Sequence, residues 1–280
     1  MGDLAADTAV TGGDGRYTCA LSRDWEIWGP NGGYMAAIAL RAAGEHSRFE
    51  RPASIVGHFL GVAEFDTVDI EVTILRAAKR AESARVSIKQ HGQPMFDAMV
   101  WSVGDVEGFE HDFTEMPRVP DPDELPTNAE RMAKKGEPEF TPYVFWKNFE
   151  QKIPDDKWID DWESRPPRAA EYSQWYRYVP VDSFADPWVD ACRLLILVDT
   201  LGWPAAGQPY PQGKYMAPSI DLLCAFHRDA SHSPWLYAQA LAPSASAGII
   251  GCESRVWTRE GALAAVGMSQ LLCRPAPWAQ

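Results

Sequence analysis

The chain has 280 residues, of which 46% are hydrophobic and 11% aromatic, so it can bury the core of one large or two medium domains. Its net charge of −13 argues against nonspecific binding to nucleic acid or to anionic membrane surfaces. Five scattered cysteines without a C-x-x-C or a zinc-site spacing predict reduced core thiols and a cytoplasmic protein.

The first third of the chain predicts one helix between short extended segments. Residues 1–15 are expected to form a flexible tail, and they lack the apolar stretch of a signal peptide. A short strand signal follows in residues 16–27. A Gly-rich turn then precedes an Ala-rich helix over residues 34–43, which Gly44 is expected to end. No apolar run in the chain is long enough to cross a membrane.

Four strands are predicted after this helix. They cover residues 53–61, 67–78, 82–90 and 94–103. The second shows the clearest alternation of apolar and polar residues, which is typical of a strand with one buried face. His91 and Gly92 form the turn between the last two. The first half therefore reads as a helix followed by an antiparallel run.

The middle of the chain has a different composition. Residues 108–140 are rich in Pro, Asp and Glu, and they are predicted to be a linker, because the prolines at positions 117, 120, 122 and 126 preclude long regular elements. Residues 143–179 carry many Trp and Tyr. They are expected to hold a helical or loop excursion and one or two strands before the second half proper.

The pattern of the first half then repeats. Asp186 and Pro187 are a good helix start, as N-cap and first helical residue, and this helix is expected to stop at Gly202 with Pro204 beyond it. Strands are predicted over residues 217–228, 235–245, 248–257 and 262–274, the last two flanking a turn at residues 258–261. The repeated order indicates an internal duplication.

Each helix is apolar nearly all round, so it must be covered on most sides, and the antiparallel sheet is the only large apolar surface in its half. The sequence therefore predicts an α+β double hotdog, in which two tandem antiparallel sheets each wrap a central helix. Joining the two sheets edge to edge would protect their exposed strands. The predicted divisions are an N-terminal unit over 16–107, a linker over 108–140 and a C-terminal unit over 141–276.

Several segments, in this order and spacing, resemble the bacterial acyl-CoA thioesterase II family. They include GGYMAAIALRAA, VTILRAAKRAESARVSIKQHGQPMF, FEHDFTEMP, PSIDLLCAFHR and GALAAVGMSQLLCR. The resemblance implies a hydrolase that converts a fatty acyl-CoA to a free acid and CoA, without a cofactor or metal. It also implies a homodimer or higher homo-oligomer.

Asp199 is the first candidate catalytic residue. It lies in LLILVDTLG, where a carboxylate has apolar helical neighbours and a desolvation cost that can raise its pKa, as suits a general base. The alternative is an acid near a helix end that turns to solvent. The resemblance aligns Asp199 with the aspartate that activates water.

Two further candidates come from the strands of the second half. The resembling family has a threonine at the position of Ser219, which keeps the hydroxyl, although a serine bonded to nearby backbone is an equally simple reading. Gln270 is matched to the family's glutamine, whose spacing to the following arginine is one residue longer, a difference that a bulge could absorb. The alternative is a surface glutamine. Asp221 is interpreted as a structural acid.

Gly32 and Gly33 stand before the first helix, where backbone N–H groups can stabilise an oxyanion, or simply form a turn. The chain has no G-x-S-x-G and no H-E-x-x-H sequence. A hotdog hydratase would need an Asp and a His five residues apart, whereas Pro204 stands five residues after Asp199. A non-catalytic acyl-CoA-binding protein stays open as the main alternative.

Overall fold

Twelve strands form one antiparallel sheet in the computed structural model, which describes residues 1–137, 143–161 and 164–276. From edge to edge the strands are β1 (Thr11–Gly13), β2 (Arg16–Ala20), β4 (Thr67–Ala77), β5 (Ala81–Gln90), β6 (Gln93–Val103), β3 (Arg51–Phe59), β10 (Asp221–Phe226), β13 (Leu263–Leu272), β12 (Ile249–Thr258), β11 (Trp235–Ser246), β8 (Glu171–Tyr178) and β7 (Phe149–Lys152). A small ribbon pairs β9 (Tyr215–Met216) with β14 (Arg274–Pro275).

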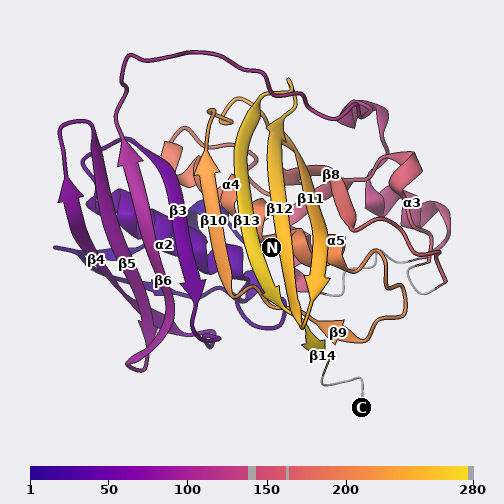
Figure 1. The fold of residues 1–280 in the computed structure, drawn as a ribbon, viewed down its shortest axis with the longest axis horizontal. Coiled ribbons are helices and arrows are strands. Elements are labelled where there is room, and N and C mark those ends of the chain that lie inside the picture. The colour runs from indigo at the N-terminus through magenta and orange to yellow at the C-terminus, as the bar shows by residue number, and fades with distance from the viewer. Residues whose placement is uncertain (138–142, 162–163, 277–280) are drawn as a thin grey trace.

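The strand order is symmetric about the centre of the sheet. β3 and β10 pair there, and each is followed outward by three strands of its own antiparallel run, so that β6 corresponds to β13, β5 to β12 and β4 to β11. Figure 1 shows the helices α2 (Gly32–His46) and α4 (Pro187–Thr200) on one side of this sheet. The predicted duplication and the α+β double hotdog are therefore confirmed.

Two segments with similar sequences meet where the halves join. Leu223 of β10 lies opposite Val56 of β3, and Cys224 lies opposite Ile55. Backbone hydrogen bonding at this join replaces two sheet edges with one continuous sheet, as the sequence predicts.

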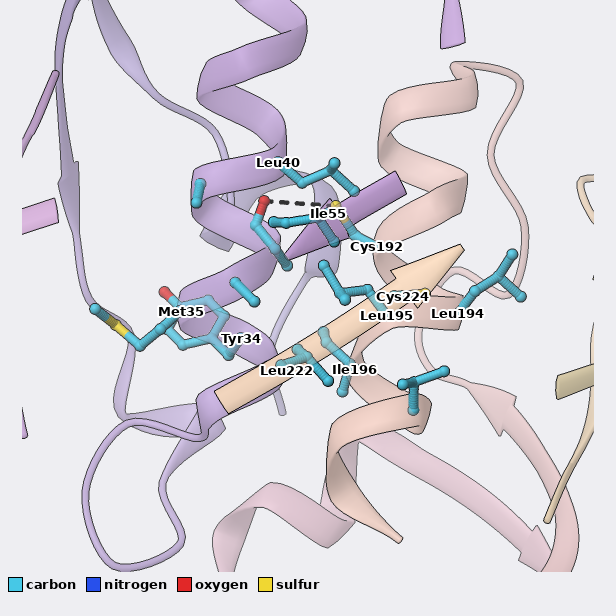
Figure 2. Close-up of a cluster of buried hydrophobic side chains, with 14 of the residues drawn as sticks. Tyr34, Met35, Leu40, Ile55, Cys192, Leu194, Leu195, Ile196, Leu222 and Cys224 are labelled. Atoms are coloured by element: carbon cyan, nitrogen blue, oxygen red, sulfur yellow. Dashed lines mark hydrogen bonds between the residues drawn. The ribbon is translucent and has the colours of Figure 1, made fainter. Parts of the chain in front are cut away.

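The two long helices lie antiparallel and side by side, because Gly44 near the end of α2 packs against Trp188 at the start of α4. Their N-caps are Asn31 and Asp186. Their side chains form much of the core, together with residues such as Leu222 of the sheet (Figure 2). Cys192 Sγ donates a weak hydrogen bond to Ala37 O across the helix pair, at 3.6 Å. Small alanines on α2 allow this close approach.

Gly44 was expected to end the first helix, but α2 continues to His46. A Cβ atom at Gly44 would lie 2.6 Å from Cδ2 of Trp188, so the glycine serves the packing of the helix pair. The second helix also differs from the prediction. α4 ends at Thr200, and a short helix α5 (Gly202–Ala206) follows at once and includes Pro204. Proline is tolerated there because it lies in a first helical turn.

The predicted flexible tail is wrong for residues 1–15. This segment forms the short helix α1 (Leu4–Asp7) and the edge strand β1. Leu4 is buried, and the amide of Gly2 donates to Asn148 Oδ1 at 2.8 Å. An acidic, Gly-rich composition suggested disorder, but a few apolar residues and a cap at Asp3 are enough to hold the segment on the core.

Short elements occupy the region between β6 and β8, as its prolines predict. They are η2 (Pro122–Glu124), α3 (Asn128–Lys134), η3 (Val144–Asn148) and η4 (Asp155–Lys157), in addition to β7. A further short helix, η1 (Arg23–Trp25), lies in the first half, before α2. The proposed division of the chain at residues 108–140 stays a prediction. Part of the region lies outside the described residues.

The described part of the predicted linker covers the outer face of the C-terminal sheet. Met116, Val119 and Leu125 pack on an aromatic row that includes Trp175 and Trp257. The indole N–H of Trp175 donates to Pro120 O at 3.1 Å, and Arg259 holds Asp121 and Asp123. The segment is therefore a structural cover, whereas the equivalent face of the N-terminal half keeps Met99 and Trp101 exposed.

Four of the five cysteines are buried, and all five are free thiols. Among the described residues, no helix combines the length and the apolar character that crossing a membrane requires.

We expect Leu125→Ala to lower the free energy of unfolding by about 2–3 kcal/mol, because the leucine is buried between the cover segment and the sheet. Urea denaturation measures this change. Leu75→Ala is the matched control, since Leu75 is exposed on β4 and its loss should cost less than about 0.5 kcal/mol. Equal effects of the two substitutions would show that the segment does not contribute to the core.

Candidate active site

A buried carboxylate lies where the two halves of the chain meet. Asp199 is at the last turn of α4, and only 7% of the residue is exposed. Its Oδ2 accepts a hydrogen bond of 2.7 Å from the backbone N–H of Gly33, in the first turn of α2. Its Oδ1 accepts a hydrogen bond of 2.8 Å from the Ser219 hydroxyl. Three separate segments therefore orient this one acid.

Burial raises the pKa of Asp199 above its ordinary value, although the hydrogen bonds from Ser219 and from Gly33 act in the opposite direction. This confirms the raised pKa expected from its apolar helical neighbours. Each carboxylate oxygen has about two acceptor positions, so each can accept a further hydrogen bond beyond the one observed. The group can therefore bind a water molecule and take a proton from it.

Ser219 lies two residues before β10 rather than in the strand itself. It forms an isolated bridge with Leu271, and the amide of Ile220 donates to Gln270 O at 2.8 Å. These bonds to β13 fix the backbone on both sides of the hydroxyl. The structure thus brings Ser219 and Asp199 together, as the sequence predicts.

Gln270 does not reach this site. Its side chain is exposed, while its neighbours Ser269 and Leu271 are buried on the helix-facing side of β13. The pairing of β13 with β12 runs without a shift from Gly267 to Leu272, so the bulge that could have turned the amide inward is absent. Because strand side chains alternate, a difference of one residue places Gln270 on the opposite face.

The position that does face inward is Ser269. It lies opposite Cys252, whose thiol is close to both Ser269 and Asp199, and burial raises the pKa of this thiol to about 12. A thiol with so high a pKa stays protonated, so Cys252 is not a nucleophile. In the resembling family the glutamine stands five residues before the arginine, and counting five residues back from Arg274 gives Ser269. This spacing was the signal in the sequence for the inward-facing position.

Asp221 has a structural contact, as predicted, because its Oδ1 accepts a hydrogen bond of 2.7 Å from the backbone N–H of Gln270.

Gly32 and Gly33 are the first two residues of α2 rather than a turn before it, and they have different surroundings. The N–H of Gly33 is already bound to Asp199, so it positions the acid and does not face a substrate oxygen. Gly32 lines the cavity described next. A Cβ atom at Gly32 would lie 2.8 Å from Asp199 Oδ2 and 3.0 Å from Phe59 Cζ, so no larger residue fits beside the acid.

A cavity of about 280 Å³ opens beside Asp199, Ser219 and Gly32. Both halves contribute to its wall, which is mainly apolar and aromatic. Among the residues that the structure describes, no group of three His, Cys, Asp or Glu side chains could hold a metal ion.

The two halves of the chain match two successive family models. The model of the acyl-CoA thioesterase N-terminal domain matches residues 21–103, and the model of the acyl-CoA thioesterase C-terminal domain matches residues 115–272. A search of curated proteins found no match.

Solved structures share the fold at low sequence identity. A conserved protein of unknown function with a hot dog fold from Alicyclobacillus acidocaldarius is 18% identical, with a TM-score of 0.81 over 97% of each chain. The acyl-CoA thioesterase II TesB2 from Mycobacterium marinum is 20% identical, with a TM-score of 0.77 over 99% of each chain. The tesB protein of Mycobacterium avium subs paratuberculosis is also 20% identical, with a TM-score of 0.77 over 97% of this chain and 98% of its own.

Replacing Asp199 with Asn should leave the fold at least as stable at pH 7. A carboxyl whose pKa is raised on folding binds its proton more tightly in the folded state, so stability falls as the pH rises from the unfolded pKa through the folded one. Asn removes this loss. Urea denaturation at pH 7 and at pH 4 measures the difference, which should be larger at pH 7.

Asp190→Asn is the matched control, because Asp190 is the other buried acid of α4 and pairs with the fully buried Arg193 at 2.6 Å. It should lower stability by about 3 kcal/mol, since Arg193 would keep a buried charge without its partner. Strong destabilisation by Asp199→Asn would mean that Asp199 is a structural acid.

Proposed function

Because the chain belongs to the acyl-CoA thioesterase family, and is a thioester hydrolase, we propose that it hydrolyses an acyl-CoA to a free acid and CoA at Asp199. The observation that carries the proposal is a buried carboxylate of raised pKa, held by Ser219 and Gly33, beside a cavity built by both halves. The resemblance found in the sequence implies a fatty acyl group.

In the proposed reaction, Asp199 and Ser219 hold a water molecule in the cavity. Asp199 takes one proton from this water while the oxygen of the water attacks the thioester carbonyl carbon. The tetrahedral intermediate then breaks its C–S bond, and the CoA thiolate leaves and receives a proton from Asp199. Since a thiolate is a good leaving group, no covalent intermediate with the protein is needed.

The developing oxyanion needs a hydrogen-bond donor. Of the two glycines that the sequence singled out, Gly33 is bound to the acid, so we infer that the N–H of Gly32 serves here. It belongs to the first turn of α2, whose N–H groups have no acceptors within the helix, and it lines the cavity. The Gln270 amide takes no part in the proposed reaction.

Five free thiols support the expected reducing, cytoplasmic compartment. The alternative is a non-catalytic acyl-CoA-binding protein. It predicts that the wild-type chain has no turnover, so that replacing Asp199 removes none.

We expect Asp199→Asn to lower kcat/KM at least about a hundredfold in a free-thiol release assay over an acyl-CoA panel, because it removes the general base. Ser219→Ala should lower it about tenfold, and Ser219→Thr, which keeps the hydroxyl, should retain activity.

Gln270→Ala is the control, and its exposed side chain predicts unchanged turnover. Full activity of Asp199→Asn would overturn the site. A loss of activity in Gln270→Ala would return the amide to the reaction.

We also propose the homodimer that the resemblance implies. An exposed apolar row crosses the centre of the outer sheet face, formed in order by Met99, Val56, Leu223 and Met268, which are direct cross-strand neighbours. Arg85, next to one end of this row, is already paired with Asp97. The proposal therefore rests on the apolar row itself, which can pack on a reversed copy of the same row about a two-fold axis.

Sedimentation velocity tests this interface with Leu223→Glu, which puts a charge at the centre of the row and should convert a dimer to a monomer. Leu75→Glu, on an exposed position away from the row, should leave the dimer intact. A wild-type monomer, or a dimer that Leu223→Glu does not weaken, would overturn this assignment.

A further inference from the structure

We propose that the cavity takes a short aryl acyl group, of about the size of phenylacetyl, in preference to a fatty acyl chain. This inference rests on the proposed thioesterase function, since it names the acyl group of the thioester that Asp199 would hydrolyse. It is carried by the identity, placement and fixed orientation of the aromatic rings around the cavity, and by its volume.

Five aromatic side chains line the cavity: Trp28, Phe59, Tyr143, Trp146 and Trp203. They come from separate parts of the chain. Trp28 lies in the loop before α2, Phe59 ends β3, Tyr143 and Trp146 lie at η3, and Trp203 lies in α5. Rings that gather from four places into one wall form a surface that suits a ring better than a flexible chain, because ring faces and edges carry opposite partial charges.

Three of these rings form a connected set. Trp28 packs edge-on against Trp203, with ring centroids 6.3 Å apart, and edge-on against Tyr143, at 6.4 Å. The indole N–H of Trp28 donates to the Tyr143 hydroxyl at 2.7 Å. The set is thus held by a polar contact as well as by packing, and its ring orientations are fixed before any ligand binds.

The loop that carries Trp28 is also fixed at both ends. Glu26 and Pro30 form a bridge, and the amide of Asn31 donates to Trp25 O at 2.9 Å. The amide of Phe145 donates to Glu26 O and connects the loop to η3. Preorganisation of this kind favours a rigid ligand, since neither partner loses much conformational freedom on binding.

The wall leads directly to the reacting groups. Trp203 follows Asp199 by four residues, and Phe59 lies against Gly32 beside the carboxylate. Phe59 is itself packed on Phe96, with ring centroids 4.9 Å apart. An acyl group whose carbonyl carbon lies next to Asp199 therefore places its first few carbons among these rings.

The volume sets the size of this group. At roughly 30 Å³ for each non-hydrogen atom, the share of a liquid water molecule, a cavity of about 280 Å³ holds about nine such atoms. A phenylacetyl group and an octanoyl group both have this number. A palmitoyl group has nearly twice as many and would leave much of its chain outside the wall.

The test compares kcat/KM for phenylacetyl-CoA, octanoyl-CoA and palmitoyl-CoA with the full chain. Phenylacetyl and octanoyl have the same number of carbons, so their ratio isolates the aryl preference, and palmitoyl reports on length. We expect phenylacetyl-CoA to exceed octanoyl-CoA by about three- to tenfold. Palmitoyl-CoA should be the poorest of the three. A ratio of phenylacetyl to octanoyl at or below one would overturn the proposal, as would palmitoyl-CoA as the best substrate.

Variants locate the preference. Trp203→Leu should bring the ratio of phenylacetyl to octanoyl close to one, and Trp203→Phe, which keeps a ring, should retain most of it. Trp101→Leu changes an exposed tryptophan on the outer sheet face and should leave both rates unchanged. An unchanged ratio in Trp203→Leu would overturn the role of this wall.

A binding measurement separates this inference from the proposed function. Calorimetry with Asp199→Asn gives the Kd of phenylacetyl-CoA and of octanoyl-CoA without turnover. If the wild-type chain hydrolyses no thioester, the proposed function fails. Tighter binding of phenylacetyl-CoA would then still support the aryl cavity, and equal or weaker binding would overturn it.

Discussion

The hydrogen bond from the Gly33 N–H to Asp199 is the contact on which the site depends. It joins the beginning of the first long helix to the end of the second, so the carboxylate is oriented only when the two halves have packed together. The small residues of the first helix allow this approach, and the pairing of β3 with β10 fixes the two helices side by side. Fold and site are therefore formed by the same packing.

Holding an acid in this position has a cost. A carboxylate at 7% exposure loses most of its hydration, and two hydrogen bonds return only part of that free energy, which is why its pKa rises. Burial also raises the pKa of Asp190, the other buried acid of the same helix, but Asp190 has the cation of Arg193 at contact distance to offset this, whereas no cation among the described residues acts on Asp199. The contrast separates an acid kept for stability from one kept for chemistry.

The sequence predicted features that depend on local pattern. The duplication followed from element order, and Asp199 followed from its apolar neighbours in a helix. Gln270 was misplaced because in GMSQLLC each of the two alternate sets of residues contains a single polar residue among small or apolar ones, so the pattern does not decide which set faces inward. The role of Gly44 was misread, and the packing of the segment that covers the C-terminal sheet was not foreseen, for a different reason. Their roles depend on Trp188 and on an aromatic row, which are distant in the chain and adjacent only in the folded structure.

The packing of Gly44 against Trp188 bears on how many sites the protein has. The interval of chain that relates the two N-caps also relates Gly33 to Trp188 and Gly44 to Asp199. The residue equivalent to Asp199 is thus Gly44, which has no side chain, and the residue equivalent to Gly33 is Trp188. The indole of Trp188 packs on Gly44, where the other junction has the hydrogen bond from Gly33 to Asp199. Two identical hotdog chains related by symmetry must carry every residue in both copies. Fusing the copies into one polypeptide released them from that identity, so that one junction could become purely a packing contact while its counterpart kept the reactive acid.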